Sequence, residues 1–131
     1  MNICLTAIEN TLNSQLDSRF GRCNYFIILD PEKTNFKPIK NELTEASERV
    51  GVLAVQVLVD NKVKHVITGN VGFRAMQALK NAGIEVSIER HTTIKDAIAN
   101  FRSGKIIKTI TPTVCGYTLS SQDTGNGIWR V

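Results

Sequence analysis

The chain has 131 residues, of which 42% are hydrophobic and 21% charged, and its formal net charge is +4. These totals predict one globular domain, and no apolar run is long enough to cross a bilayer. The basic residues are scattered and only 6% of the chain is aromatic, so we expect no nucleic-acid binding, which needs a stripe of charge with interleaved aromatics. Three cysteines without metal-finger spacing, and a start without a basic leader or cleavage site, predict a cytoplasmic protein with reduced thiols.

The first half of the chain predicts three strands and a helix. The strands cover residues 2–8, 24–30 and 36–41, and the last two form a hairpin. A polar connection over 42–48 leads to an almost continuously apolar segment over 50–60. Periodicity cannot separate helix from strand in this segment, but its length and the strand that follows it favour a helix.

The second half alternates strands with helices. Strands over 65–68 and 84–88 alternate with helices over 73–81 and 94–102, and Gly83 and Thr93 supply a helix stop and a helix start. Such alternation implies right-handed crossovers and parallel strands. We therefore predict a three-layer α/β/α sandwich of the ribonuclease H-like type, with a mixed five-stranded sheet of order 3-2-1-4-5 and strand 2 antiparallel. The domain covers 1–107, and 108–131 form a tail, with one short strand over 105–110.

Four segments of this sheet are expected to meet at one end. Ligands of open α/β sheets lie beyond the carboxyl ends of the parallel strands. Residues 9–11, 69–72 and 89–92 follow the three parallel strands, and residues 18–23 precede the antiparallel one. The sequence therefore predicts a binding site where these segments converge.

The residue types at this end favour a small anionic ligand. A glycine-containing turn over 69–72 leads directly into a helix, whose N-terminus attracts anions. An alternative is that these glycines only permit a tight turn, since their spacing matches neither a P-loop nor a dinucleotide fingerprint. The predicted binding residues are Arg19, Phe20, Gly21, Arg22, Gly69, Asn70, Gly72 and Arg74.

Two further residues at this end are candidate metal ligands. Cys23 offers a thiolate, whose pKa the adjacent Arg22 would lower, and His91 offers an imidazole. The competing interpretation is that Cys23 is a small residue at a strand start and that His91 is an inert surface residue. Cys4 is expected in the core, and His65 at the opposite end of the sheet.

The predicted central strands argue against a nuclease. Two-metal phosphoryl chemistry needs clustered carboxylates on these strands. Residues 3–8 and 66–68 contain no acid. No local motif supports a Ser-His-Asp or Cys-His arrangement either. We therefore predict no catalytic residues and expect a protein that is not an enzyme.

The chain resembles the dinitrogenase iron-molybdenum cofactor biosynthesis family, the small domain of NifX and related accessory proteins. The resemblance covers about residues 1–107. It rests on residues 1–5, 18–22 with 25–26, Gly51, Ala54, Leu58, 66–72, Ala75, Leu79 and 83–86. The stretch over 46–51 departs from the family, because it lacks the histidines that many relatives carry there.

This resemblance implies a ribonuclease H-like fold and non-catalytic binding of metal clusters. The hypothesis is a binding or carrier protein for an anionic iron-sulfur or molybdenum-containing cluster or its precursor, with other cofactor-assembly proteins as partners. One alternative is a metal-free protein-interaction or regulatory domain. A third is an enzyme that acts on a small phosphorylated metabolite at the same site.

Overall fold

A computed structural model describes residues 1–33, 35–42, 50–105 and 108–109. The elements in chain order are β1 (Asn2–Ala7), β2 (Tyr25–Leu29), β3 (Phe36–Lys40), α1 (Val50–Asp60), β4 (Val63–Thr68), α2 (Phe73–Asn81), β5 (Glu85–Ile88), α3 (Ile94–Arg102) and β6 (Lys108–Thr109). The three helices have the predicted bounds. β4 begins two residues earlier than predicted.

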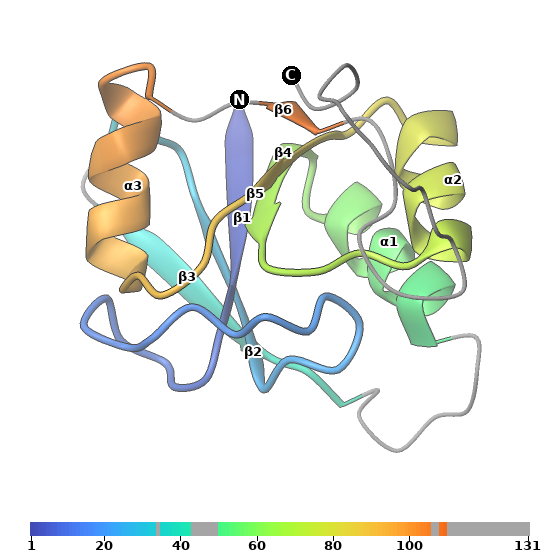
Figure 1. Ribbon diagram of the computed structural model, residues 1–131, viewed down its shortest axis with the longest axis horizontal. Helices are drawn as coiled ribbons and strands as arrows, with labels where there is room; N and C mark the ends of the chain where they lie inside the picture. Colours follow the sequence, from blue (N-terminus) through green and yellow to red (C-terminus); the bar gives the residue numbers. More distant parts are fainter. Residues whose placement is uncertain (34, 43–49, 106–107, 110–131) are drawn as a thin grey trace, which may run out of the picture.

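The strands form one mixed sheet of order β3-β2-β1-β4-β5-β6 (Figure 1). β1 pairs antiparallel with β2 and parallel with β4, and β4 pairs parallel with β5. This confirms the predicted order 3-2-1-4-5 with strand 2 antiparallel. The sixth strand, β6, lies within the short strand predicted over 105–110 and pairs antiparallel with β5. The rest of the tail lies outside the described residues, so its extent remains a prediction.

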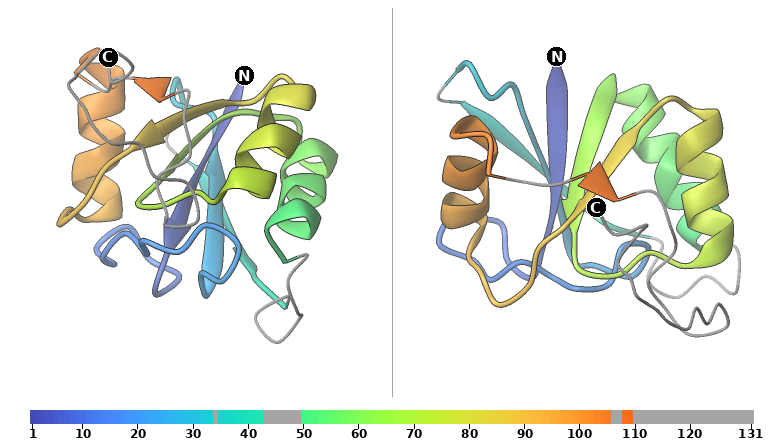
Figure 2. Two further views of the ribbon diagram at one scale, coloured as in Figure 1. Left: turned by 45° about the vertical axis from the view of Figure 1, so that its right-hand side comes forward. Right: turned by 45° about the horizontal axis from the view of Figure 1, so that its top comes forward.

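The helices cover the two faces of the sheet, α1 and α2 on one side and α3 on the other (Figure 2). β1 is buried on both faces, as a central strand must be. Its odd-numbered side chains, such as Ile3 and Leu5, pack between the sheet and α3, in what we call the α3 core. Cys4 packs on the other face, between the sheet and the two helices α1 and α2, in what we call the α1–α2 core. Thr93 accepts a hydrogen bond from the N–H of Asp96 and thereby caps the predicted start of α3.

A long loop over residues 8–24 crosses the carboxyl end of the sheet, where β1, β4 and β5 end (Figure 1). The N–H of Leu16 donates to Thr92 O at 2.9 Å, which fixes this loop to the segment before α3. The N–H of Phe20 donates to Asn70 O at 3.3 Å, which fixes it to the segment after β4. The loop therefore joins the ends of three strands. None of the described helices is long and apolar enough to span a bilayer.

Candidate functional site

A cavity of about 540 Å³ opens where the loop over 18–22 meets the starts of α1 and α2; we call it the first cavity. Its lining contains Arg19, Arg22 and Arg74 and, within the described part of the chain, no acidic side chain. The remaining lining residues are Ser18, Phe20, Gly21, Val50, Gly51, Val52, Asn70, Gly72, Phe73 and Ala75. The structure thus brings seven of the eight predicted binding residues to one cavity.

Arg19 is held in place by a buried acid that the sequence analysis did not identify. Its Nε and one terminal nitrogen donate to the two carboxylate oxygens of Asp17 at 2.9 and 2.8 Å. The Asp17 side chain is 4% exposed and the Arg19 side chain 56%. These hydrogen bonds raise the pKa of Arg19, so its charge is secured. Arg19 therefore presents a fixed cation at the cavity.

Asp17 is fixed in turn by the central strands. Its N–H donates to Thr6 O at 2.8 Å, and the hydroxyl of Thr6 donates to Asp17 O at 2.6 Å. Thr6 Oγ1 also lies 2.7 Å from Thr68 Oγ1, so this network joins β1 to β4. A chain of hydrogen bonds thus runs from the ends of β1 and β4 to the guanidinium of Arg19.

Two glycines allow backbones to meet around the first cavity. A Cβ atom on Gly69 would lie 2.6 Å from Ser18 Cα, and one on Gly21 would lie 2.9 Å from Gly51 Cα. Both distances are too short for real atoms to share. Gly69 is buried and does not itself line the cavity, so its role is to let the 18–22 loop approach β4.

The N-terminus of α2 adds partial positive charge. Gly72 is its N-cap and makes no side-chain capping hydrogen bond. The first N–H groups of a helix have no partner inside the helix, and the helix dipole favours an anion beside them. Arg74 stands in the first turn. The cavity is thus cationic from two sources.

This donor set fits an anion rather than a bare metal ion. Guanidinium and backbone N–H groups donate hydrogen bonds and have no lone pair for a metal. In the residues that the structure describes, no group of three His, Cys, Asp or Glu side chains could hold a metal ion. A metal-containing ligand would be held through the anionic atoms around its metal.

Cys23 lies outside this cavity, which argues against its predicted role as a ligand. Its side chain is fully buried, and Asn41 Nδ2 donates to its carbonyl oxygen at 2.8 Å. Burial raises the pKa of the Cys23 thiol, and the negative charge of Asp17 adds to this rise. The sequence argument had expected Arg22 to lower this pKa, but desolvation is the larger effect. Cys23 is therefore a protonated core residue next to the site.

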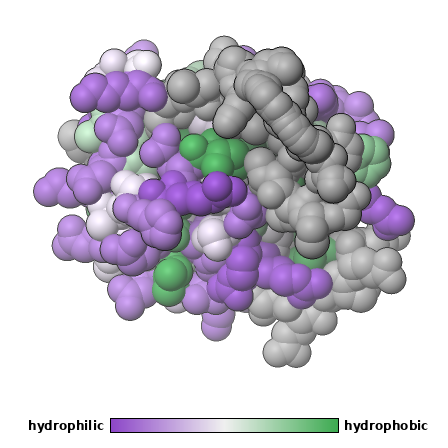
Figure 3. Space-filling model, viewed as in Figure 1, coloured by the Kyte–Doolittle hydropathy of each residue, from purple (hydrophilic) through white to green (hydrophobic). Residues whose placement is uncertain are grey.

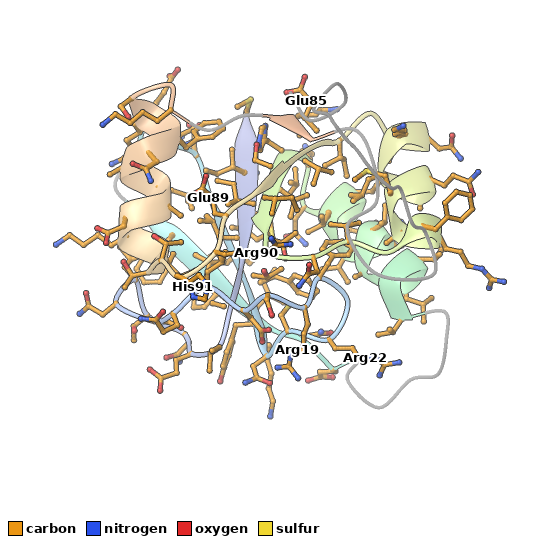
Figure 4. The ribbon with its side chains drawn as sticks, in the orientation of Figure 1. Arg19, Arg22, Glu85, Glu89, Arg90 and His91 are labelled. Carbon is orange, nitrogen blue, oxygen red and sulfur yellow. The ribbon has the colours of Figure 1, made fainter. Side chains whose placement is uncertain are left out.

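His91 lines a second cavity, of about 630 Å³, on the other side of Arg19. We call it the second cavity; its lining also contains Asp17, Glu89 and Arg90. His91 has a φ of 57°, in the left-handed region that non-glycine residues seldom adopt. Figure 4 shows Glu89, Arg90 and His91 on the segment after β5, away from Arg22. The two predicted metal ligands therefore do not meet.

The structure also aligns a serine, a histidine and an acid that no local motif had indicated. Ser87 Oγ lies 2.7 Å from Nε2 of His65, and Nδ1 of His65 lies 3.5 Å from a carboxylate oxygen of Glu85. Ser87 has no exposed surface and His65 stacks edge-on against Phe101. A substrate cannot reach a fully buried serine. The hydrogen bonds of Ser87 and His65 therefore satisfy buried polar groups in the α3 core.

The comparisons with known proteins identify the family of this chain. The family model described as dinitrogenase iron-molybdenum cofactor matches residues 1–104. The chain belongs to this family. It is 30% identical to an uncharacterized protein of Methanocaldococcus jannaschii over 99 residues, which are 73% of this chain and 84% of the relative.

Two solved structures of relatives share the fold. The apo form of the orange protein from Desulfovibrio gigas has a TM-score of 0.83 and 30% identity, over 86% of this chain and 96% of that protein. A Thermotoga protein provisionally described as a NifB protein has a TM-score of 0.77 and 33% identity, over 88% of this chain and 98% of its own. This family member therefore has the α/β fold of those relatives.

Sequence reasoning did not assign Asp17, Ser18 or Val52 to the site. Asp17 stands two residues before Arg19, a spacing at which the acid can reach the guanidinium, and this was the available signal. Ser18 and Val52 carry no chemical pattern in the sequence and reach the cavity only through the close loop contacts. Such contacts depend on tertiary structure.

Proposed function

We propose that this protein is a non-catalytic carrier of an anionic metal-sulfur cluster, of the iron-sulfur or molybdenum-containing type, or of its precursor. The first cavity holds this cargo, and Arg19, Arg22 and Arg74 neutralise its charge. The observation that carries the proposal is a cavity whose described lining has three arginines and no acid, with Arg19 oriented from behind by Asp17. Membership of the iron-molybdenum cofactor family supports it.

The walls of the first cavity suit such cargo. Arginine is more weakly hydrated than lysine and donates from a planar fork. Phe73, half exposed at the cavity, and Val52 add apolar surface beside the cations. A sulfide-rich anion is large and weakly hydrated, so it gains from both kinds of wall. The cluster is cargo, and a site that holds it through hydrogen bonds and charge alone can release it to a cofactor-assembly protein without breaking a metal–protein bond.

The test is an anaerobic titration with tetrathiomolybdate, followed by absorption spectroscopy. Arg22→Ala should weaken binding about tenfold or more, given the roughly 1.5–3 kcal/mol of a hydrogen bond to a charged group. Lys80→Ala, at the far end of α2, removes one charge outside the cavity and should bind normally. No binding by the wild-type protein would favour the metal-free interaction domain. Equal affinity of Arg22→Ala and the wild-type protein would mean that the cargo binds outside the first cavity.

A further inference from the structure

The second cavity contains a cation that the proposed carrier function does not use. Arg90 is exposed and lines this cavity, on the segment between β5 and α3. Its terminal nitrogen donates to Asn70 Oδ1 at 2.8 Å. That acceptor is a neutral amide, and none of the ion pairs found among the described residues includes Arg90. Its positive charge is therefore not neutralised by a carboxylate there.

The second cavity also contains two acids, Asp17 and Glu89, and neither forms an ion pair with Arg90 in the described part of the chain. Both carboxylate oxygens of Asp17 accept hydrogen bonds from Arg19, so Asp17 is engaged there and not with Arg90. Figure 4 shows Glu89 and His91 toward the α3 side of the segment after β5, and Arg90 nearer the middle of the molecule. The face seen in Figure 3 is mostly hydrophilic around this segment, as suits a polar ligand.

The hydrogen bond to Asn70 prepares Arg90 for binding. A free arginine loses about 0.5–1.5 kcal/mol of side-chain freedom when a ligand immobilises it. Asn70 holds one terminal nitrogen and leaves the guanidinium's other donors available, since arginine carries five N–H groups. The backbone of Asn70 is itself held, because its carbonyl oxygen accepts from the Phe20 N–H.

We propose that the second cavity is a separate binding site for a small oxyanion, a carboxylate or phosphate group, which Arg90 binds through a charge-assisted hydrogen bond. The bond to Asn70 Oδ1 already has a charged donor, and an ionised acceptor adds an ion-pair attraction that the neutral amide cannot give. The site goes beyond the carrier function and does not depend on it, because it uses neither Arg22 nor Arg74. The Arg19–Asn70 contact separates it from the first cavity.

The experiment is NMR titration of the isotope-labelled, cargo-free protein with inorganic phosphate and, separately, with malonate, at constant ionic strength in chloride. The amides of residues 15–17 and 89–91 should shift together along one binding curve. The amides of residues 72–75 should follow a different curve, because they report on the first cavity. Equal affinities for the two probes indicate a general oxyanion site, and a preference for either one names the group that the site takes.

Arg90→Gln should raise the apparent Kd at residues 89–91 at least tenfold and leave the curve at residues 72–75 unchanged. Lys95→Gln removes one exposed positive charge from α3 without touching the second cavity and should leave both curves unchanged. An Arg90→Gln protein that keeps its affinity would overturn the proposal, as would an equal loss in Lys95→Gln. Loss of thiomolybdate binding alone would count against the carrier function and leave this site intact.

Discussion

Asp17 makes Arg19 a fixed cation, and this is the residue-level feature on which the first cavity most depends. The carboxylate is buried and both of its oxygens are used by Arg19. If only net charge mattered, removal of the nearby acid Asp17 would strengthen anion binding. If Asp17 matters because it positions Arg19, its removal weakens binding, since the ligand must then immobilise the Arg19 side chain.

We expect Asp17→Asn to weaken thiomolybdate binding several-fold, up to about tenfold, because an immobilised side chain represents roughly 0.5–1.5 kcal/mol. The measurement is the same anaerobic titration. Asp60→Asn, at the end of α1, is the matched control and should not alter binding. Tighter binding by Asp17→Asn would show that Asp17 opposes the anion instead of positioning Arg19.

The buried thiols give a second prediction at this scale. Burial raises the pKa of Cys4 and of Cys23 above the ordinary value for a thiol. In a Cys115→Ser protein we therefore expect no rapidly reacting thiol at pH 8, measured with a chromogenic disulfide, and two after unfolding in urea. A fast-reacting thiol in the folded protein would contradict the assignment of Cys23 to the core.

The same pKa shift determines how stability changes with pH. Above about pH 9 the unfolded chain releases thiol protons that the folded protein retains. The contribution of these thiols to the free energy of unfolding is therefore complete below this pH and is lost as the pH rises toward the folded-state pKa. Urea unfolding from pH 8 to 10 should show a smaller decline when Cys23 is replaced by alanine.

Among the elements, the glycine contacts explain why two segments far apart in the sequence form one wall. Gly69 lets the 18–22 loop lie against the end of β4, and Gly21 lets it approach Gly51 at the start of α1. The sequence indicated both glycine turns as features of a site. It could not indicate that their function is close approach between backbones, because the contacting partners are 30 or more positions away.

Gly69→Ala should lower the free energy of unfolding by about 1–3 kcal/mol, because its Cβ would meet the Ser18 backbone. It should also weaken anion binding, since Ser18 and Arg19 must move. Gly83→Ala is the control: a Cβ there would meet nothing within 4 Å, although its φ of 74° disfavours alanine. That variant should be destabilised by roughly 1–2 kcal/mol and bind normally. Both variants would be measured by thiomolybdate titration and by urea denaturation. If Gly69→Ala and Gly83→Ala bound the anion equally well, the close-approach role of Gly69 would be contradicted.

For the molecule as a whole, the architecture was predictable from sequence because its signals are local. Alternating strands and helices, apolar faces and a capping threonine specify the order of elements and the helix bounds. The placement of charges was partly predictable, since the carboxyl ends of parallel strands meet at one end of the sheet. Side-chain burial was not predictable, and Cys23 is the clear example. The neighbouring Arg22 suggested an activated thiolate, whereas burial in the α1–α2 core governs the state of the thiol.

The division of the ligand end into two cavities was also beyond the sequence. Arg19 and Asn70 pair as an isolated bridge between the segments that follow β1 and β4. That contact places Arg22 and Arg74 on one side and Arg90 and His91 on the other. A single site with Cys23 and His91 as ligands was therefore the wrong grouping, although most of the residues assigned to that end of the sheet do lie there.

The central claim is that the first cavity holds a metal-sulfur anion through hydrogen bonds and not through a metal–protein bond. The most direct measurement is anomalous diffraction at the molybdenum edge from crystals soaked anaerobically with tetrathiomolybdate. We predict a peak between Arg19, Arg22 and Arg74, with no protein sulfur or imidazole nitrogen bonded to the metal. A peak bonded to Cys23 or His91, or no peak in the first cavity, would contradict the account.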